Sequence, residues 1–146
     1  PLNWLGDPSL ALPSVIMADI WEWTPFKALI LLAGLQALPR DPFEAAIVDG
    51  ASSFQLFRYV ILPLLQPTII IATLLRIMDA FKTFDLVFVL THGGPGMSTE
   101  VLSYYTYRYG FKFFHIGHAS ALSYLLLVII IIITQVFVRY LKIGEE

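Results

Sequence analysis

The residues best suited to bind a ligand lie in two otherwise apolar segments of this sequence. They are Asp19, Glu22, Trp23 and Phe26 in the first segment, and Arg76 and Asp79 near the middle of the second. The first four follow the spacing i, i+3, i+4 and i+7, which places them on one face of a helix. Carboxylates and a guanidinium hydrogen-bond hydroxyl groups, and aromatic rings cover the apolar C–H face of a sugar. The pattern therefore favours a polyhydroxylated solute.

Two other interpretations of these residues stay open. First, the charged residues can have a purely structural role and pair with one another or with another subunit. Such pairing offsets the cost of burying a charge, which is about 3 kcal/mol at the centre of a membrane-spanning helix. Charged residues of the second segment indeed recur every three residues, at Arg76, Asp79, Lys82 and Asp85; neighbours in that series can pair along a helix. Alternatively, Arg76 can bind the phosphate or carboxylate of an anionic substrate.

A polar hairpin of two short helices is predicted between the two segments. Asp41 is a good N-cap, Pro42 suits the first helical position, and Glu44 lies where a capping-box acid reaches back to free backbone donors. Gly50 predicts the end of this first helix, because glycine takes a positive φ without steric cost.

The second helix of the hairpin is predicted to begin at Ser52. Gln55 follows three residues later and completes a capping box. Pro63 predicts its end, because the residue before a proline is pushed out of the α region. The product is a compact helix-turn-helix with an apolar face and an acidic tip.

This hairpin resembles the cytoplasmic EAA loop of ABC importer permeases. The resemblance is carried by Glu44-Ala45-Ala46, by Gly50 after three further residues, and by Val60-Ile61-Leu62-Pro63 after nine more. The string from Glu44 to Ala51 is similar to the sugar and polyol branch of that family, and Val60 stands where the family usually has isoleucine. The resemblance implies that Glu44 contacts a partner ATPase and that Gly50 allows a tight turn and close approach. The implied coupling residues are Glu44, Ala45, Ala46, Asp49, Gly50, Ala51, Leu62 and Pro63.

The resemblance also implies partners for the chain. They are two ATPase subunits that bind ATP and Mg²⁺, a second permease subunit, similar or identical, an extracytoplasmic solute-binding protein, and a sugar or polyol as substrate. In related sugar permeases the solute pathway is lined by the two helices that carry the polar residues here. The chain itself is expected to be no enzyme and to hold no cofactor, since it has no G-x-x-x-x-G-K-[ST] phosphate loop. We expect a fragment that corresponds to about the C-terminal half of a permease.

Composition indicates a membrane protein. Of the 146 residues 58% are hydrophobic and 14% are charged, against about 25% charged residues in soluble domains. We expect one domain over residues 1–146, an all-α multi-pass transmembrane bundle of about three spans. The spans are predicted at about 14–38, 64–90 and 119–138, with a cytoplasmic loop at 39–63 and an extracytoplasmic loop at 91–118.

The distribution of basic residues predicts the orientation in the cell membrane. Four lie on the face of the hairpin and the C-terminus, against two on the other face: Arg40, Arg58, Arg139 and Lys142, against Arg108 and Lys112. Basic residues collect on the cytoplasmic side, so the hairpin and the C-terminus are expected there.

The extracytoplasmic loop is expected to form a short aromatic helix after Thr99. Such a helix serves either as an interfacial belt or as a docking surface for an extracytoplasmic binding protein. His115 and His118 have no carboxylate or cysteine companions, so no metal site is expected. The net charge of −2 gives no basic surface for nucleic acid.

Two alternatives to an ATP-driven importer remain. One is an ion-driven secondary transporter or channel subunit that uses the same charges. The other is a membrane-embedded enzyme with Asp19, Glu22 or Asp79 as general acid or base, although no nucleophile–base pair or metal motif accompanies them. Dependence on ATP separates both from the importer.

Overall fold

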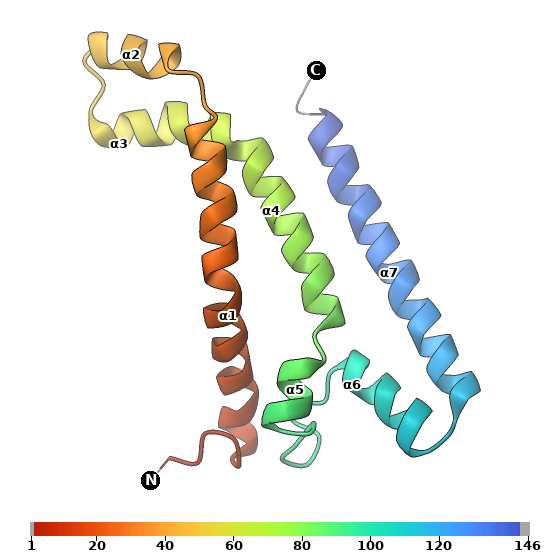
Figure 1. Cartoon of the computed structure of the whole chain (residues 1–146). Helices are drawn as coiled ribbons and strands as arrows, with labels where there is room; N and C mark the ends of the chain where they lie inside the picture. The colour runs from red at the N-terminus through yellow and green to blue at the C-terminus, as the bar shows by residue number, and fades with distance from the viewer. Residues whose placement is uncertain (1, 144–146) are drawn as a thin grey trace.

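The structure is a computed structural model that describes residues 2–143, with the backbone alone for residues 140–143. The described residues form helices joined by short loops, which confirms the expected all-α class. In chain order these are α1 (Pro8–Gln36), α2 (Asp41–Val48), α3 (Ser53–Leu56), the π-helical turn η1 (Phe57–Ile61), α4 (Leu62–Lys82), α5 (Asp85–Leu90), α6 (Leu102–Tyr107), the π-helical turn η2 (Arg108–Lys112) and α7 (Ile116–Ile143). Figure 1 shows the long helix α4 between α1 and α7, with α2 and α3 at one end of the molecule and α5 and α6 at the other.

Helix α1 begins six residues before the predicted span. Asp7 caps it, since its Oδ1 accepts hydrogen bonds from Ser9 N at 2.8 Å and from Ser9 Oγ at 2.6 Å. These hydrogen bonds lower the pKa of the Asp7 carboxyl, and the bond from the Ser9 hydroxyl contributes more than the bond from the Ser9 backbone N–H. Pro13 and Pro25 lie inside the helix, which continues to Gln36.

Two of the described helices are long and apolar enough to cross a membrane. They are Ser53–Lys82, which combines α3, η1 and α4, and Ile116–Arg139 within α7. Helix α1 is not one of them, and it carries Asp19, Glu22 and Lys27. The α7 helix contains the predicted span 119–138.

The segment predicted as a span at 64–90 is not one continuous helix. Helix α4 ends at Lys82, Thr83 turns out of the helix with ψ 115°, and α5 starts only at Asp85. The turn is fixed from outside, because Ser103 Oγ donates to the carbonyl of Thr83 and the ring of Phe84 packs against the aromatic residues of α6. Tertiary contacts therefore end the helix inside a segment that the sequence predicted to continue.

Two local features of the hairpin form as predicted. Gly50 has φ 79° and ends the first arm. Gln55 Oε1 accepts from Ser52 N at 2.8 Å, and Gln55 N donates to Ser52 Oγ at 3.4 Å, which completes the capping box. The prediction of Asp41 as N-cap was wrong: Asp41 is the first helical residue, and the cap is Arg40, which makes no side-chain capping bond.

Pro63 does not end the second arm, so that prediction was also wrong. Helical backbone runs without interruption from Ser53 to Lys82. Just before the proline the helix widens, and the N–H of Leu62 donates to the carbonyl of Phe57, five residues back. A wider turn accommodates a residue that has no N–H and whose ring crowds the preceding turn. The hairpin is thus joined to α4 by continuous helix.

The buried core lies at the end of the molecule opposite the hairpin, where α1, α5 and α6 meet. Its most buried residues are Val15, Val87 and Tyr104, surrounded by the partly buried Phe84, Leu86, Phe88, Leu90, Val101 and Tyr107. Full burial of side chains of this size contributes about 1.5–3 kcal/mol each. The core therefore fixes the start of α1 against α5 and α6, whereas many apolar side chains of α7 are exposed.

The loop between α5 and α6 is held by buried polar groups. Thr99 Oγ1 donates to the carbonyl of Gly94 at 2.8 Å and lies 2.7 Å from Thr91 Oγ1. Glu100 and Arg108 form an ion pair at 3.0 Å. The expected short aromatic helix is present beyond this loop as α6, which continues directly into η2.

Candidate functional site

The polar residues predicted on two separate segments meet between α1 and α4. Asp19 and Arg76 form an ion pair across the two helices, with side chains only 14% and 17% exposed. The guanidinium carbon of Arg76 lies 5.5 Å from the centroid of the Trp23 ring, a cation–π contact. Arg76 therefore pairs across the helices, and not along α4 with Asp79.

A polar cavity of about 220 Å³ adjoins this ion pair. Its lining comprises Asp19, Glu22 and Trp23 of α1, Asp79 and Lys82 of α4, and Thr83, Phe84, Asp85 and Leu86 at the turn into α5. Asp79 Oδ1 and Lys82 Nζ lie 3.2 Å apart. Four carboxylates against one lining lysine make the cavity acidic, which favours a neutral, hydroxyl-bearing ligand over an anion.

The ion pair retains capacity for further hydrogen bonds. Asp19 Oδ1 and Arg76 Nη1 are buried and have no partner among the described residues. Buried polar atoms normally form hydrogen bonds. A ligand hydroxyl or a water molecule can therefore donate to Asp19 Oδ1 and accept from Arg76 Nη1.

Two of the predicted pathway residues do not line the cavity. Phe26 packs edge-on against Trp23, with ring centroids 5.9 Å apart, but its side chain is 47% exposed and does not line the cavity. Arg76 does not line the cavity either, and reaches it through Asp19 and Trp23.

The turn residues that complete the cavity were missed at the sequence level. Lys82 and Asp85 stood out by their three-residue spacing, but Thr83, Phe84 and Leu86 carried no signal. They reach the cavity because α4 ends at Lys82, and that ending depends on contacts with α6.

The predicted coupling residues lie in three parts of the structure. Glu44, Ala45 and Ala46 lie in α2, Asp49, Gly50 and Ala51 form the turn, and Leu62 and Pro63 open α4. Ala46 and the three turn residues line a shallow hollow of about 360 Å³ together with Gln55, Tyr59 and Val60. Glu44 is exposed on α2 and outside that hollow, and Leu62 and Pro63 lie at the base of the second arm.

The tip of the hairpin also exposes apolar side chains. Val48 is 87% exposed, Phe54 74% and Ile47 62%. A short exposed element with this many apolar groups is typical of a protein-docking surface. The signal was present in the sequence as Ile47-Val48 directly before Asp49-Gly50.

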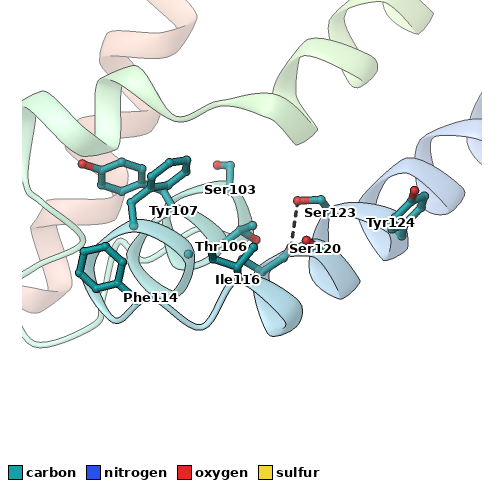
Figure 2. A pocket seen from close by; sticks show the side chains of 11 residues that line it. Ser103, Thr106, Tyr107, Phe114, Ile116, Ser120, Ser123 and Tyr124 are labelled. Carbon is teal, nitrogen blue, oxygen red and sulfur yellow. Dashed lines mark hydrogen bonds between the residues drawn. The ribbon is translucent and has the colours of Figure 1, made fainter.

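A larger cavity elsewhere among the described residues has different chemistry. It measures about 640 Å³ and lies between α6, η2 and the first turns of α7 (Figure 2). Its lining holds rings such as Tyr107 and Phe114 and several hydroxyls but no charged residue. The hydroxyls of Thr106 and Ser123 already donate to backbone carbonyls, at 2.8 and 3.0 Å. This cavity is therefore a poor site for a polar solute.

The sequence matches a model of one protein family over nearly its whole length. The model for "Binding-protein-dependent transport system inner membrane component" matches residues 2–142. The chain is similar to the trehalose/maltose transport system permease protein MalF of Thermococcus litoralis, with 46% identity over 145 residues, 99% of this chain and 48% of that protein. It is also similar to the sulfoquinovosyl glycerol transport system permease protein SmoG of Agrobacterium fabrum, with 37% identity over 139 residues, 95% of this chain and 45% of that protein.

A solved structure shares the fold. A chain of the bacterial alginate ABC transporter, in complex with an alginate pentasaccharide-bound periplasmic protein, superimposes with a TM-score of 0.83 and 25% identity. The match covers 93% of this chain and 48% of that chain. The present chain spans about half the length of the relatives that it matches.

Proposed function

Because the chain belongs to the family of binding-protein-dependent transport system inner membrane components, we propose that it is part of the transmembrane subunit of an ATP-driven importer of a sugar or polyol. Relatives named for trehalose, maltose and sulfoquinovosyl glycerol support a polyhydroxylated substrate. In this proposal the chain performs no catalysis and holds no cofactor, and separate ATPase subunits bind ATP and Mg²⁺.

One observation carries the proposal. A single continuous helix, Ser53–Lys82, carries the hairpin at one end and lines the polar cavity at the other. A rigid element of this kind transmits a movement of the hairpin directly to the cavity. Such a link is what coupled transport requires.

The proposed arrangement in the membrane has three spans. Helix α1 acts as the first span, and its charged face is covered by α4 through the ion pair between Asp19 and Arg76. The end of the molecule with α2 and α3 faces the cytoplasm, and the end with α5 and α6 faces outward (Figure 1). The excess of basic residues at the hairpin end supports this orientation.

The solute pathway in this proposal passes the cavity between α1 and α4. Asp19, Glu22 and Asp79 accept hydrogen bonds from solute hydroxyls, and Trp23 stacks on the apolar face of the sugar ring. Phe26 supports the ring of Trp23 from behind, and Arg76 holds Asp19 in place.

The partners follow from the two ends of the molecule. We propose that the assembly contains two ATPase subunits. The hairpin of this chain binds an ATPase subunit through Glu44 and the exposed apolar tip. A second permease subunit and an extracytoplasmic solute-binding protein complete the assembly. The alginate transporter in complex with a periplasmic protein supports this last partner by analogy.

The proposal is tested by uptake into proteoliposomes that contain the complete assembly. Uptake of a stimulating sugar is expected to require ATP inside the proteoliposomes, on the side of the hairpin, and to persist without an ion gradient. Asp79→Asn is expected to raise the apparent KM for the sugar about tenfold, because one charged hydrogen bond contributes about 1.5–3 kcal/mol. Asp41→Asn, outside the cavity, serves as the matched control. Uptake driven by an ion gradient without ATP would establish the secondary-transporter alternative instead.

A further inference from the structure

The joint between the hairpin and α4 contains one residue more than an α-helix needs. In an α-helix, Leu62 would donate to Arg58, four residues back; here it donates to Phe57, five residues back. The turn Phe57–Ile61 is therefore a π turn inserted in continuous helix, with α geometry on both sides. Such insertions are rare in proteins, and those that occur often lie at functional sites.

A proline alone does not explain this turn. Pro13, Pro25 and Pro67 lie inside α1 and α4, and the described residues have no π turn at any of them. A second constraint besides Pro63 therefore determines the position of the π turn.

The hairpin supplies that second constraint. The capping box at Ser52 fixes the start of the second arm. Helix α2 packs against both α3 and η1, and Tyr59 and Val60 of the π turn line the hollow of the hairpin. Pro63 constrains the other side of the turn, because its ring would crowd the carbonyl of Tyr59 in an α-helix. The extra residue is thus held between two fixed elements.

We propose that this π turn sets the rotational phase of the hairpin relative to α4, so that the number of residues between Ser52 and Leu62 positions the ATPase-binding surface. This inference rests on the proposed coupling function. If the same residues took α geometry, α3 would turn by about 100° around the helix axis and shift by about 1.5 Å. The exposed surface of the hairpin would then face another direction.

The test uses length variants in the complete assembly. One variant inserts a single alanine after Arg58. The other deletes Arg58 and carries Pro63→Ala, which leaves an ordinary α-helix with the original phase. A single alanine inserted after Gly96, in a loop position with open space, is the matched control. The sequence contains no cysteine, so spin labels can be attached at Ser53→Cys on α3 and Ile71→Cys on α4, both exposed sites outside the proposed ATPase-binding tip.

The two readouts are the distance between the labels and the solute-stimulated ATP hydrolysis. We expect the insertion after Arg58 to shift the distance by several ångströms and to reduce stimulation at least tenfold. The deletion with Pro63→Ala and the control insertion should keep both values within twofold of the parent protein.

Three results would overturn the inference. They are an unchanged distance in the insertion variant, a shifted distance with full stimulation, and loss of the parental distance in the deletion variant. Should the insertion prevent assembly, the deletion variant still decides. A parent assembly without any stimulation contradicts the proposed function instead, and the label distance still tests the phase by itself.

Discussion

At the scale of single residues, the ion pair between Asp19 and Arg76 allows the charged face of α1 to pack against α4. Each side chain is mostly buried, so removal of one partner leaves an uncompensated charge. The same pair adjoins the polar cavity and keeps one unpartnered atom on each side. It thus has both a structural and a proposed functional role.

These two roles can be separated by substitution. Arg76→Ala is expected to destabilise the folded protein by about 3 kcal/mol, because Asp19 stays buried without its partner. The double variant Asp19→Leu with Arg76→Met should recover most of that stability, since two apolar side chains replace the pair, but should not recover uptake. Thermal unfolding and uptake of the same samples measure the two effects. A double variant that transports normally would remove the pair from the proposed pathway.

The loop before α6 allows a second test at the residue scale. Gly93 has φ 82°, and a Cβ there would lie 2.7 Å from Tyr104 Cε1 of the core. Gly96 has φ 64° but open space around it. Both Gly→Ala variants incur about 1–2 kcal/mol for the left-handed backbone, and only Gly93→Ala also displaces Tyr104.

We therefore expect Gly93→Ala to lower the stability clearly more than Gly96→Ala. Thermal unfolding and protease sensitivity of residues 91–100 measure the difference. Equal losses would show that backbone conformation alone matters in this loop.

At the scale of elements, small residues set the contact between α1 and α4. A Cβ on Gly34 would lie 2.6 Å from Thr68 Cγ2, so the two helices pass each other closely at this point. Close approach through small residues is a common way to pack helices in membranes.

Gly34→Ala should consequently push α1 and α4 apart and lower the stability, although alanine is the better helix former. Thr68→Ala in the same chain should restore much of the loss, because it removes both nearest atoms. Gly117→Ala, in a helix with open space around it, is the control and is expected to be neutral or stabilising by up to about 1 kcal/mol. A stabilised Gly34→Ala variant would contradict the close contact.

The sequence predicted the elements best where local chemistry decides them. The capping box at Ser52 and the positive φ of Gly50 depend on adjacent residues and were confirmed. The end of α4 at Lys82 and the π turn before Pro63 were not predicted, because contacts from α6 and α2 determine them. Pro63 in particular signals a helix end locally, and only the surrounding structure shows how the helix continues.

The candidate site follows the same division. The one-face spacing of Asp19, Glu22 and Trp23 could be read directly, and the structure brings these residues to one cavity. Which cation would pair with Asp19 could not be read, because the partner lies on another helix, 57 residues away. Phe26 shares the helical face but lies one turn too far from the cavity.

At the scale of the whole molecule, the EAA loop predicted the family correctly, and the match over residues 2–142 confirms it. A twenty-residue motif identified the family because its acid, glycine and Leu-Pro lie at fixed offsets. The arrangement of the described helices adds what the motif does not contain, a continuous helix between the hairpin and the polar cavity. Coupling through this helix is the central claim of the proposed function.

The most direct test of that claim is solute-stimulated ATP hydrolysis by the complete assembly, with and without Glu44→Lys. We expect stimulation to fall at least tenfold while the ATPase subunits remain bound, because the charge reversal disrupts the proposed contact on α2. Asp41→Lys places the same charge change in the same helical turn and should retain most of the stimulation. Undiminished stimulation in Glu44→Lys would contradict coupling through this face of the hairpin.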